Sequence, residues 1–373
     1  MKKVLFTATV DSHILHFHIP YLKYFHEQGY EVHVATNGTE EIPFCDKKIV
    51  IPFERSPYKV NNIKAIFQLK KVIEKEHYEL IHTHTPMGSV VTRLAAKKAR
   101  KRTGTKVLYT AHGFHFYKGA PMMNWLLFYP IEKILSNYTD TLITINKEDY
   151  ELATKKFKKT NVKYVPGVGI DEEKFSFKLS EEEKKQLRQS LNLNEDDFVM
   201  IYPAELNKNK NQELLIQMMQ KLIKINSNFK LLLPGRDSFN GEYQKLIQKL
   251  ELKDSILILG LRKDIVKLLQ ISDLSVASSF REGLPMNVIE AMYIGLPVVA
   301  TNCRGHRDLV ISGETGYLVP FNTEDFIQKI IDISQNKELY SKLSKNSKIQ
   351  SERYSLTKVL KETIHIYENT LRK

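Results

Sequence analysis

Two glutamates, Glu282 and Glu290, lie eight positions apart around a turn that contains glycine and proline. Gly283 lets the backbone come close to a ligand, and proline is favoured at the first position of a helix, so we expect a helix to begin near Pro285. The free N–H groups and the dipole of that helix end would attract phosphate. A carboxylate further along the helix can accept hydrogen bonds from sugar hydroxyls. Diphosphate and polyol together describe a nucleotide sugar.

Cationic side chains follow other predicted strands in the same half of the chain. The polar loop at 203–212 leads into a predicted helix, and Lys210 stands just before that helix. A lysine in this position can neutralise a diphosphate as a point charge. Two further strands end in glycine followed closely by arginine, at Gly235 with Arg236 and before Arg262. Solvated loops also contain such residues, but together they predict a cationic site.

Short apolar runs alternate with amphipathic segments along nearly the whole chain, which predicts parallel sheets with helical crossovers. Because parallel strands place their carboxyl ends at one sheet edge, the loops of Lys210 and Glu282 are expected to meet there. The predicted strands are residues 4–10, 31–35, 48–52, 80–85, 106–111, 141–145, 162–165, 198–204, 229–234, 255–259, 274–279, 297–301 and 317–319.

A length of 373 residues exceeds what one hydrophobic core usually organises, so two domains are expected. We predict an α/β protein with two doubly wound, Rossmann-like domains that face each other across a cleft, with ligands at the carboxyl ends of the strands. The alternation breaks around residues 166–171. The predicted domains are therefore residues 1–170 and 171–352, and a C-terminal helix at 353–373 is expected to pack back on the first domain.

The chain carries a formal net charge of +13, with basic runs at 97–102 and 155–159. Nucleic acid, an anionic membrane surface and anionic substrates would all be attracted to it, although lysine runs also simply solvate helix faces. No nucleic-acid partner is expected, because no recognition motif is evident. Two cysteines, Cys45 and Cys303, are too few for a disulfide framework and favour a reducing compartment.

Neither a signal peptide nor a spanning segment is expected. The N-terminus lacks a long apolar core, and no apolar run approaches the ~18 residues that cross a bilayer, so a cytoplasmic location is predicted. The glycine signatures of dinucleotide-binding and P-loop proteins are also absent from the sequence. A dehydrogenase or P-loop enzyme is therefore disfavoured.

Residues 198–320 resemble the nucleotide-sugar half of the retaining family 4 glycosyltransferases of GT-B fold. The resemblance rests on the Glu282 to Glu290 motif, on Gly-Leu-Pro-Val-Val-Ala-Thr at 295–301 and on Gly-Glu-Thr-Gly-Tyr-Leu-Val at 313–319. It implies that Glu282 contacts the donor sugar and that Glu290 binds ribose. The remaining residues expected to bind the donor, mainly at its phosphates, are Gly283, Leu284, Pro285, Met286, Asn287, Gly235, Arg236 and Arg262.

One departure from the family concerns the diphosphate site. The family usually has Gly-Arg-Leu where this chain has Ala-Glu-Leu at 204–206, so an arginine is missing while Lys210 remains. A carboxylate at this position would repel phosphate, so we expect Glu205 to turn to a neighbouring lysine or arginine. The lost charge would come from Arg262, Arg304 or Arg307.

The first half resembles the same family more loosely, at residues 29–34, 81–84 and 110–113. Asp-Ser-His at 11–13 replaces the glycine pair that often follows the first strand. Together with the aromatic segment after His112, this resembles the subgroup that builds bacterial capsule and exopolysaccharide repeat units on a lipid carrier. The resemblance implies that His112 touches the donor sugar and acts in catalysis with Glu282 and Lys210.

Histidines cluster near the predicted strand ends of the first half. His82 and His84 stand two apart on a strand, point to the same face and are able to ligate a metal. Cleft-lining hydrogen bonds are favoured instead, because no carboxylate or cysteine is near them and cations and amides would serve the phosphates. No metal is therefore expected. The seven residues are His13, His16, His18, His82, His84, His112 and His115.

The segment 114–129 contains the only tryptophan, Trp125, among many aromatic side chains. A buried helix could use them all. The alternative is an interfacial segment that enters the headgroup region, beside a basic run that meets anionic lipid. A lipid-linked acceptor would account for both features.

We therefore expect a retaining glycosyltransferase, metal-independent and without a cofactor, at the inner face of the cell membrane. It would transfer a hexose or hexosamine from a UDP-linked donor to a lipid-linked saccharide in capsule or exopolysaccharide synthesis, with cationic groups stabilising the departing diphosphate. Two alternatives stay open. A nucleotide-sugar epimerase also has a diphosphate site, although no acid and base beside the sugar can be named. A non-enzymatic basic protein would bind a membrane surface or nucleic acid.

Overall fold

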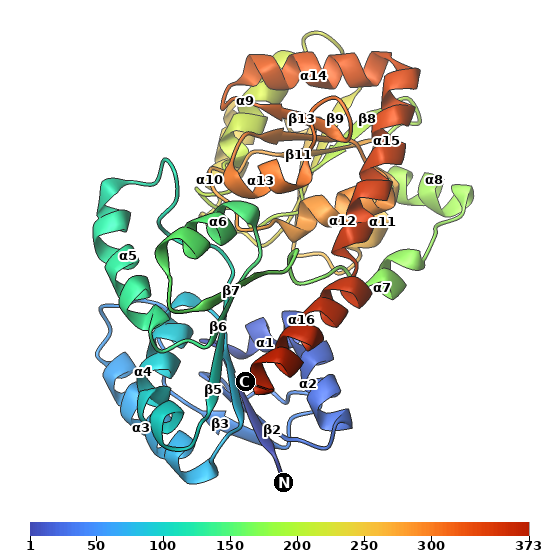
Figure 1. The fold of residues 1–373 in the computed structure, drawn as a ribbon. Helices are drawn as coiled ribbons and strands as arrows, with labels where there is room; N and C mark the ends of the chain where they lie inside the picture. The colour runs from blue at the N-terminus through green and yellow to red at the C-terminus, as the bar shows by residue number, and fades with distance from the viewer. Residues whose placement is uncertain (373) are drawn as a thin grey trace. The chain divides into compact units, whose positions relative to one another are not determined.

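The computed structural model describes residues 1–372, which form two compact units. The first unit comprises residues 1–169 and the C-terminal segment from residue 357, and the second comprises residues 170–356. Each unit contains one parallel sheet with helices between its strands (Figure 1). The predicted α/β class with two doubly wound, Rossmann-like domains is confirmed.

The first unit is built on a seven-stranded sheet with the order β3-β2-β1-β4-β5-β6-β7. The order reverses between β1 and β4, because β4 lies on the side of β1 opposite to β2. Its strands are β1 (Lys3–Thr7), β2 (Glu31–Thr36), β3 (Lys47–Val50), β4 (Leu80–Thr83), β5 (Lys106–Ala111), β6 (Thr141–Thr144) and β7 (Asn161–Tyr164). Its helices are α1 (Asp11–Phe17), α2 (Ile19–Glu27), α3 (Asn61–Glu76), α4 (Pro86–Arg102), α5 (Met122–Ser136), α6 (Lys147–Lys156) and α16 (Leu356–Leu371).

The second unit is built on a six-stranded sheet with the order β10-β9-β8-β11-β12-β13, which reverses between β8 and β11. Its strands are β8 (Phe198–Ile201), β9 (Phe229–Pro234), β10 (Ile256–Gly260), β11 (Leu274–Ala277), β12 (Val298–Thr301) and β13 (Gly316–Val319). Its helices are α7 (Glu172–Ser176), α8 (Glu181–Ser190), α9 (Gln212–Leu222), α10 (Glu242–Lys249), α11 (Ile265–Gln270), α12 (Met286–Ile294), α13 (Arg304–Leu309), α14 (Thr323–Gln335) and α15 (Lys337–Ser351), followed by the short 3-10 helix η1 (Glu352–Tyr354).

All thirteen predicted strands are present, and the differences lie at their ends. The strand expected at 274–279 stops at Ala277, because the next two residues bind neighbouring loops instead of continuing the ladder. The Ser278 hydroxyl donates a hydrogen bond of 2.8 Å to the carbonyl oxygen of Lys210. The Thr301 hydroxyl donates one of 2.7 Å to the carbonyl oxygen of Ser279. The chain therefore leaves the sheet at a position fixed by side chains.

Alternate residues of β1 enter two hydrophobic clusters, as expected of a strand covered on both faces. Val4 and Phe6 pack in a cluster that includes residues of α2 and α16. Leu5 packs in a cluster that includes residues of α3 and α4. All three side chains are fully buried. Burial of both faces explains why the strands appear in the sequence as continuous apolar runs.

Helix α16, at the end of the chain, packs in the core of the first unit. Its residues Val359 and Tyr367 are fully buried in the same cluster as Phe25 of α2, and Figure 1 shows α16 beside α1 and α2. The Tyr367 hydroxyl lies 2.7 Å from Nδ1 of His82, the buried histidine of β4. This hydrogen bond joins the last helix to β4, and a second one of 3.0 Å joins Thr370 of the helix to Thr141 of β6.

Replacing Tyr367 with phenylalanine is expected to lower the free energy of unfolding by about 1 to 3 kcal/mol, because Nδ1 of the buried His82 would lose its partner. Urea denaturation followed by circular dichroism measures the change. Tyr24→Phe is the matched control, since Tyr24 is only partly buried against the same cluster and should cost less than about 0.5 kcal/mol. Equal losses in the two variants would contradict the role of this hydrogen bond.

Candidate functional site

Helix α12 begins one residue after the proline of the predicted turn. Pro285 is the N-cap residue, with φ −77° and ψ 112°, and no side chain caps the helix. The prediction of a helix near Pro285 is confirmed. Because no side chain occupies the first N–H groups of α12, these donors can bind an anion at the turn.

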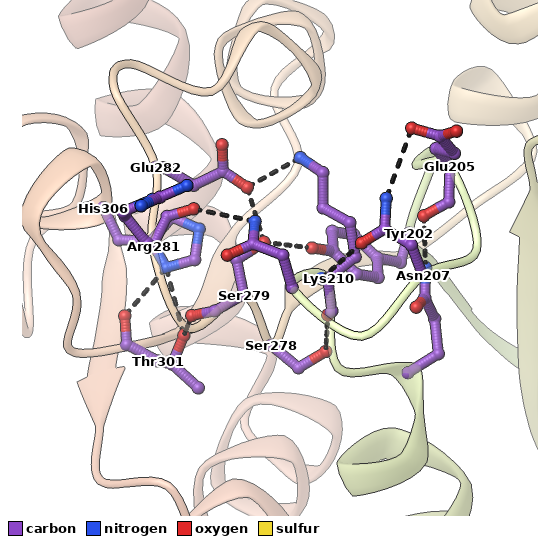
Figure 2. A network of polar contacts seen from close by, with 12 residues as sticks. Tyr202, Glu205, Asn207, Lys210, Ser278, Ser279, Arg281, Glu282, Thr301 and His306 are labelled. Atoms are coloured by element: carbon purple, nitrogen blue, oxygen red, sulfur yellow. Dashed lines mark hydrogen bonds and ion pairs between the residues drawn. The ribbon is translucent and has the colours of Figure 1, made fainter. Parts of the chain in front are cut away.

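Glu282 and Lys210 form an ion pair in front of this turn (Figure 2). Lys210 Nζ lies 2.6 Å from Glu282 Oε1, and both side chains are largely buried, at 21% and 13% exposure. The Ser279 hydroxyl donates a second hydrogen bond of 2.5 Å to the same carboxylate oxygen. Since that hydroxyl has only one proton, the Tyr202 hydroxyl 2.7 Å away must donate to Ser279. Two side chains therefore fix the orientation of the Glu282 carboxylate.

The loops after β8 and β11 are bonded to each other along their length. Asn209 Nδ2 donates to the carbonyl oxygen of Arg281 at 3.0 Å, and the Phe280 N–H donates to the carbonyl oxygen of Asn209 at 2.9 Å. These loops leave the two strands between which the order of the sheet reverses. Such a reversal opens a crevice outside the carboxyl ends of the strands, where ligands of doubly wound sheets bind. The predicted meeting of Lys210 with Glu282 is confirmed.

Helix α13 also contacts the turn. Arg304 Nε donates to the carbonyl oxygen of Glu282 at 3.2 Å. A Cβ atom on Gly305 would lie 2.7 Å from Glu282 Cβ and 2.9 Å from the carbonyl oxygen of Gly283, so only glycine fits here. His306 follows, with Nδ1 at 2.8 Å from the carbonyl oxygen of Thr301 and with burial lowering its pKa.

Sequence reasoning did not identify several side chains that form this site. They come from the loop after β8, the loop after β11 and helix α13, and only their positions after strands marked them, because serine, asparagine and glycine are common in loops. A close approach of backbones, as at Gly305, leaves no signal in a single sequence beyond the glycine itself. The residues are Tyr202, Asn209, Ser279, Gly305 and His306.

The expectation for Glu205 is wrong. Its carboxylate accepts hydrogen bonds from the Ser238 hydroxyl and, at 3.2 Å, from Asn207 Nδ2, and no lysine or arginine pairs with it within residues 1–372. The cause is local packing of the loops after β8 and β9, where the Leu206 N–H donates to the carbonyl oxygen of Arg236 at 2.9 Å. Glu205 is exposed, so water also solvates its charge.

The predicted residues after β9 and β10 have different surroundings. Gly235 is essential to the packing, because a Cβ atom there would lie 1.8 Å from the carbonyl oxygen of Ala204. Arg236 is exposed. Arg262 is paired with Asp264 through two hydrogen bonds of 2.7 and 2.6 Å, so its charge is already neutralised. Since β10 is separated from β8 by β9, these observations favour Lys210 over Arg262 as the cation nearest to Glu282.

Glu290 lies on α12, about one turn beyond Met286 at the start of the helix. It is partly buried, and burial raises the pKa of its carboxyl group to about 7, against a smaller lowering by Lys174. Met286 and Asn287 form the first turn of the same helix. The carboxyl group can therefore change its charge near neutral pH and accept hydrogen bonds from hydroxyl groups when ionised.

His112 lies in the other unit, directly after β5, and contacts histidines rather than carboxylates. Its Nε2 lies 3.3 Å from Nε2 of His13. Burial lowers the pKa of His112 to about 4 and that of His82 to about 3, so both rings are neutral at pH 7. His82 is hydrogen bonded to Tyr367 on one side and, at 2.8 Å, to Thr110 on the other.

Two groups of residues in the described part of the chain could hold a metal ion by the proximity of their ligand atoms. One group contains Glu31, His33 and Glu76, which already pair with neighbouring side chains, including Lys3 with Glu76 at 2.5 Å. The other contains four histidines, His13, His18, His84 and His112.

The first unit contains a cavity of about 610 Å³ beside the histidines. Most of its lining is aliphatic or aromatic, with a few polar groups such as Arg55 and His16. A site of this size and composition suits an organic ligand with an apolar part. Its apolar residues include Phe17, Pro57, Met87, Leu127, Phe128 and Ile131.

The aromatic segment at 114–129 has a buried face, as predicted for a buried helix, and an exposed face, and its predicted contact with a membrane surface stays a prediction. Trp125 packs against the buried Phe116, whereas the side chains of Met122, Met123 and Leu126 are about 70% exposed. Four exposed lysines of the run 155–159 surround the buried Phe157, which belongs to the same cluster. No helix within residues 1–372 combines the length and the apolarity that crossing a membrane requires.

Comparison with known proteins finds relatives along the whole chain. Residues 183–350 match the family Glycosyl transferases group 1, and residues 3–146 match the family Glycosyl transferase 4-like. The putative glycosyltransferase EpsD of Bacillus subtilis (strain 168) is 45% identical over 369 residues, covering 98% of this chain and 96% of that protein. A second relative is the UDP-Gal:alpha-D-GlcNAc-diphosphoundecaprenol alpha-1,3-galactosyltransferase of Escherichia coli. It is 29% identical over 296 residues, which cover 77% of this chain and 74% of that protein.

Solved structures show the same fold. Anabaena Alr3699/HepE, crystallised in complex with UDP and glucose, superimposes with a TM-score of 0.77 at 21% identity, covering 99% of this chain and all of the other. A likeness at this level of identity establishes the fold, which is GT-B, as the sequence predicted.

Gly305→Ala tests the packing of α13 against the turn. Alanine in an open helix position would stabilise by up to about 1 kcal/mol, whereas the contacts at 2.7 and 2.9 Å predict a net loss of about 1 to 3 kcal/mol in the free energy of unfolding. Urea denaturation distinguishes the two signs. A gain in stability would show that the turn does not approach α13 as described.

Proposed function

Because the chain belongs to the group 1 glycosyltransferases, we propose that it transfers a hexose or hexosamine from a UDP-sugar to a lipid-linked saccharide with retention of configuration. The product would be a repeat unit of a capsule, an exopolysaccharide or a related surface glycan. The observation that carries the proposal is the ion pair between Lys210 and Glu282, in front of the uncapped end of α12.

The donor diphosphate would bind between the Lys210 ammonium and the first N–H groups of α12. In the structure Glu282 neutralises this ammonium at 2.6 Å. A bound diphosphate would become the counterion of Lys210 and leave Glu282 free to accept hydrogen bonds from the sugar. One cation thus couples phosphate binding to sugar orientation, and the ammonium faces the group on which negative charge develops as the bond to the sugar breaks.

Retention of configuration is proposed without a covalent intermediate on Glu282. The Ser279 hydroxyl and the Lys210 ammonium both bind Oε1 of its carboxylate, which suits a group that orients a sugar more than one that attacks it. An oxygen of the departing diphosphate would take the proton of the acceptor hydroxyl while the acceptor attacks from the same face. This step requires no further acid or base from the chain.

A UDP donor is supported by the relatives. The Escherichia coli galactosyltransferase is named for UDP-Gal, and HepE was crystallised with UDP. Glu290 would bind the ribose hydroxyls, since its carboxylate lies on the helix whose first turn would hold the phosphates. The role of His112 toward the donor sugar stays a prediction.

A lipid-linked acceptor is supported by two features of the first unit. Its cavity of about 610 Å³ is lined mainly by apolar side chains and can receive the apolar part of an acceptor. The exposed methionines 122 and 123 of α5 and the lysines at 155–159 provide apolar and cationic contacts for an anionic membrane surface. The Escherichia coli relative is named for an acceptor on diphosphoundecaprenol.

Neither alternative function is favoured by an observation on residues 1–372. An epimerase would need an acid and a base that face the sugar, and the side chains bonded to Glu282 are a lysine and a serine. A purely electrostatic binding protein would not need the bonded arrangement of Tyr202, Ser279 and Glu282. Incubation with UDP-sugars and no acceptor separates the cases, since an epimerase would convert the sugar.

Lys210→Ala and Glu282→Ala are each expected to lower the rate of sugar transfer by about 100-fold or more, because each removes a group that acts on the reacting end of the donor. Transfer is measured with UDP-glucose, UDP-galactose and UDP-N-acetylglucosamine and an undecaprenyl-diphosphate-linked N-acetylglucosamine acceptor. Lys208→Ala is the matched control, since Lys208 is exposed in the same loop. Full activity of both purified variants would overturn the assignment of this site.

Affinity for UDP is expected to rise by up to about tenfold between pH 6 and pH 8. Glu290 has a pKa of about 7, and its ionised form is the better acceptor for ribose hydroxyls, so binding strengthens as the proton leaves. Isothermal titration calorimetry across this range measures the effect. Glu290→Gln removes the titrating group while the titration of UDP itself is unchanged, so an identical pH dependence in the variant would contradict the ribose contact.

A further inference from the structure

Four histidines of the first unit meet at the carboxyl edge of its sheet. His13 lies on α1, His18 joins α1 to α2, His84 follows β4 and His112 follows β5. One ring nitrogen from each lies within 4.8 Å of those of the other three. Since β4 lies between β1 and β5 in the sheet, segments distant in the sequence supply adjacent side chains.

The rings of His18 and His84 lack the partners that buried polar groups normally have. Both side chains are essentially inaccessible, at 2% and 0% exposure, and none of their four ring nitrogens has a hydrogen-bond partner. The rings stack with their centroids 3.6 Å apart. Leaving such groups unsatisfied destabilises the folded state, and buried polar atoms almost always have a partner. An additional bound species that accepts nitrogen lone pairs would remove this cost.

The spacing of the other two rings fits a tetrahedral metal ion. A zinc ion bound to nitrogen at about 2.0 to 2.1 Å places its ligand atoms about 3.3 Å apart. Nε2 of His13 and Nε2 of His112 are separated by 3.3 Å. Neutral imidazole is the form that ligates a metal, and binding of the ion releases any proton from the coordinating nitrogen.

His82 and His16 belong to the surroundings of this cluster and are not ligands. Both ring nitrogens of His82 are taken, by Tyr367 at 2.7 Å and by Thr110 at 2.8 Å. The His82 ring lies 4.0 Å from the ring of His84 and limits where that ring can turn. Nδ1 of His16 donates to the carbonyl oxygen of Ser12 within its own helix. The sequence pointed to His82 with His84 as the possible metal pair, but His84 instead meets histidines from other segments.

We propose that His13, His18, His84 and His112 bind one divalent transition-metal ion, with Zn²⁺ as the expected ion, in a structural site. Four protein ligands fill a tetrahedral zinc and leave no position for a reacting group, which is typical of structural sites. Imidazole ligands also suit copper and nickel. By coordinating all four histidines, the ion would crosslink α1 and the start of α2 to the loops after β4 and β5. Because the ion would occupy a ring nitrogen of His112, this proposal replaces the predicted contact of His112 with the donor sugar. The transfer proposed above relies on Lys210 and Glu282 and does not depend on the ion.

The test is metal binding to the full chain. Protein stripped with a chelator is titrated with Zn²⁺, and the bound metal is measured after gel filtration by mass spectrometry of the elements. About one bound equivalent is expected, together with a higher melting temperature, since an ion that binds only the folded state stabilises it. With Co²⁺ in place of Zn²⁺, the strong visible absorption of a tetrahedral site is expected.

Variants distinguish this site from binding elsewhere. His84→Ala and His13→Ala should each weaken zinc binding by at least about 100-fold. Removing a metal ligand is expected to reduce the affinity at least as much as removing a side chain that hydrogen-bonds to a ligand. His13 is only partly buried, so His13→Ala remains informative if His84→Ala fails to fold. His16→Ala is the matched control and should bind as the parent protein does. Absence of tight binding to the parent, or equal binding by all three variants, would overturn the proposal, whatever the outcome for sugar transfer.

Discussion

The donor side of this protein depends on the bonding between two loops that leave adjacent strands of one sheet. The strand order reverses between β8 and β11, so their loops diverge and would leave an unfilled crevice without further contacts. Two hydrogen bonds hold the loops together. The Ser278 hydroxyl donates to the carbonyl oxygen of Lys210, and Asn209 Nδ2 donates to the carbonyl oxygen of Arg281. With both backbones fixed, the lysine and Glu282 can pair at 2.6 Å despite lying 72 positions apart.

Parallel sheets buried on both faces explain which features the sequence could predict. Strands such as β1 place alternate residues in two cores, so each strand is a short apolar run that stands out locally. The turn before α12 was also predictable, because glycine and proline have strong backbone preferences. These signals are contained within a few neighbouring residues. They established the fold, the start of α12 and the placement of Lys210 opposite Glu282.

Contacts between side chains of different segments were much less predictable. The expectation that Glu205 pairs with a cation was wrong because Ser238, beyond the next strand, reaches its carboxylate first. Arg262 bonds the nearby Asp264, a contact two residues away that outweighs any more distant partner. Charge alone indicated which groups attract each other. Which of them meet depends on loop paths, and those are decided by backbone contacts such as that of Gly235 with Ala204.

Buried polar groups in the two units have different surroundings. The Glu282 carboxylate has bonded partners, whereas the rings of His18 and His84 do not. In the second unit the Glu282 carboxylate is bound by both an ammonium and a hydroxyl. Within residues 1–372 no carboxylate pairs with the four clustered histidines of the first unit, and desolvation lowers the pKa of His18 and His84. Burying ring nitrogens without hydrogen-bond partners is unfavourable, yet the rings of His18 and His84 are stacked with their centroids 3.6 Å apart. A cation shared among the lone pairs is the simplest physical reason for burying them together.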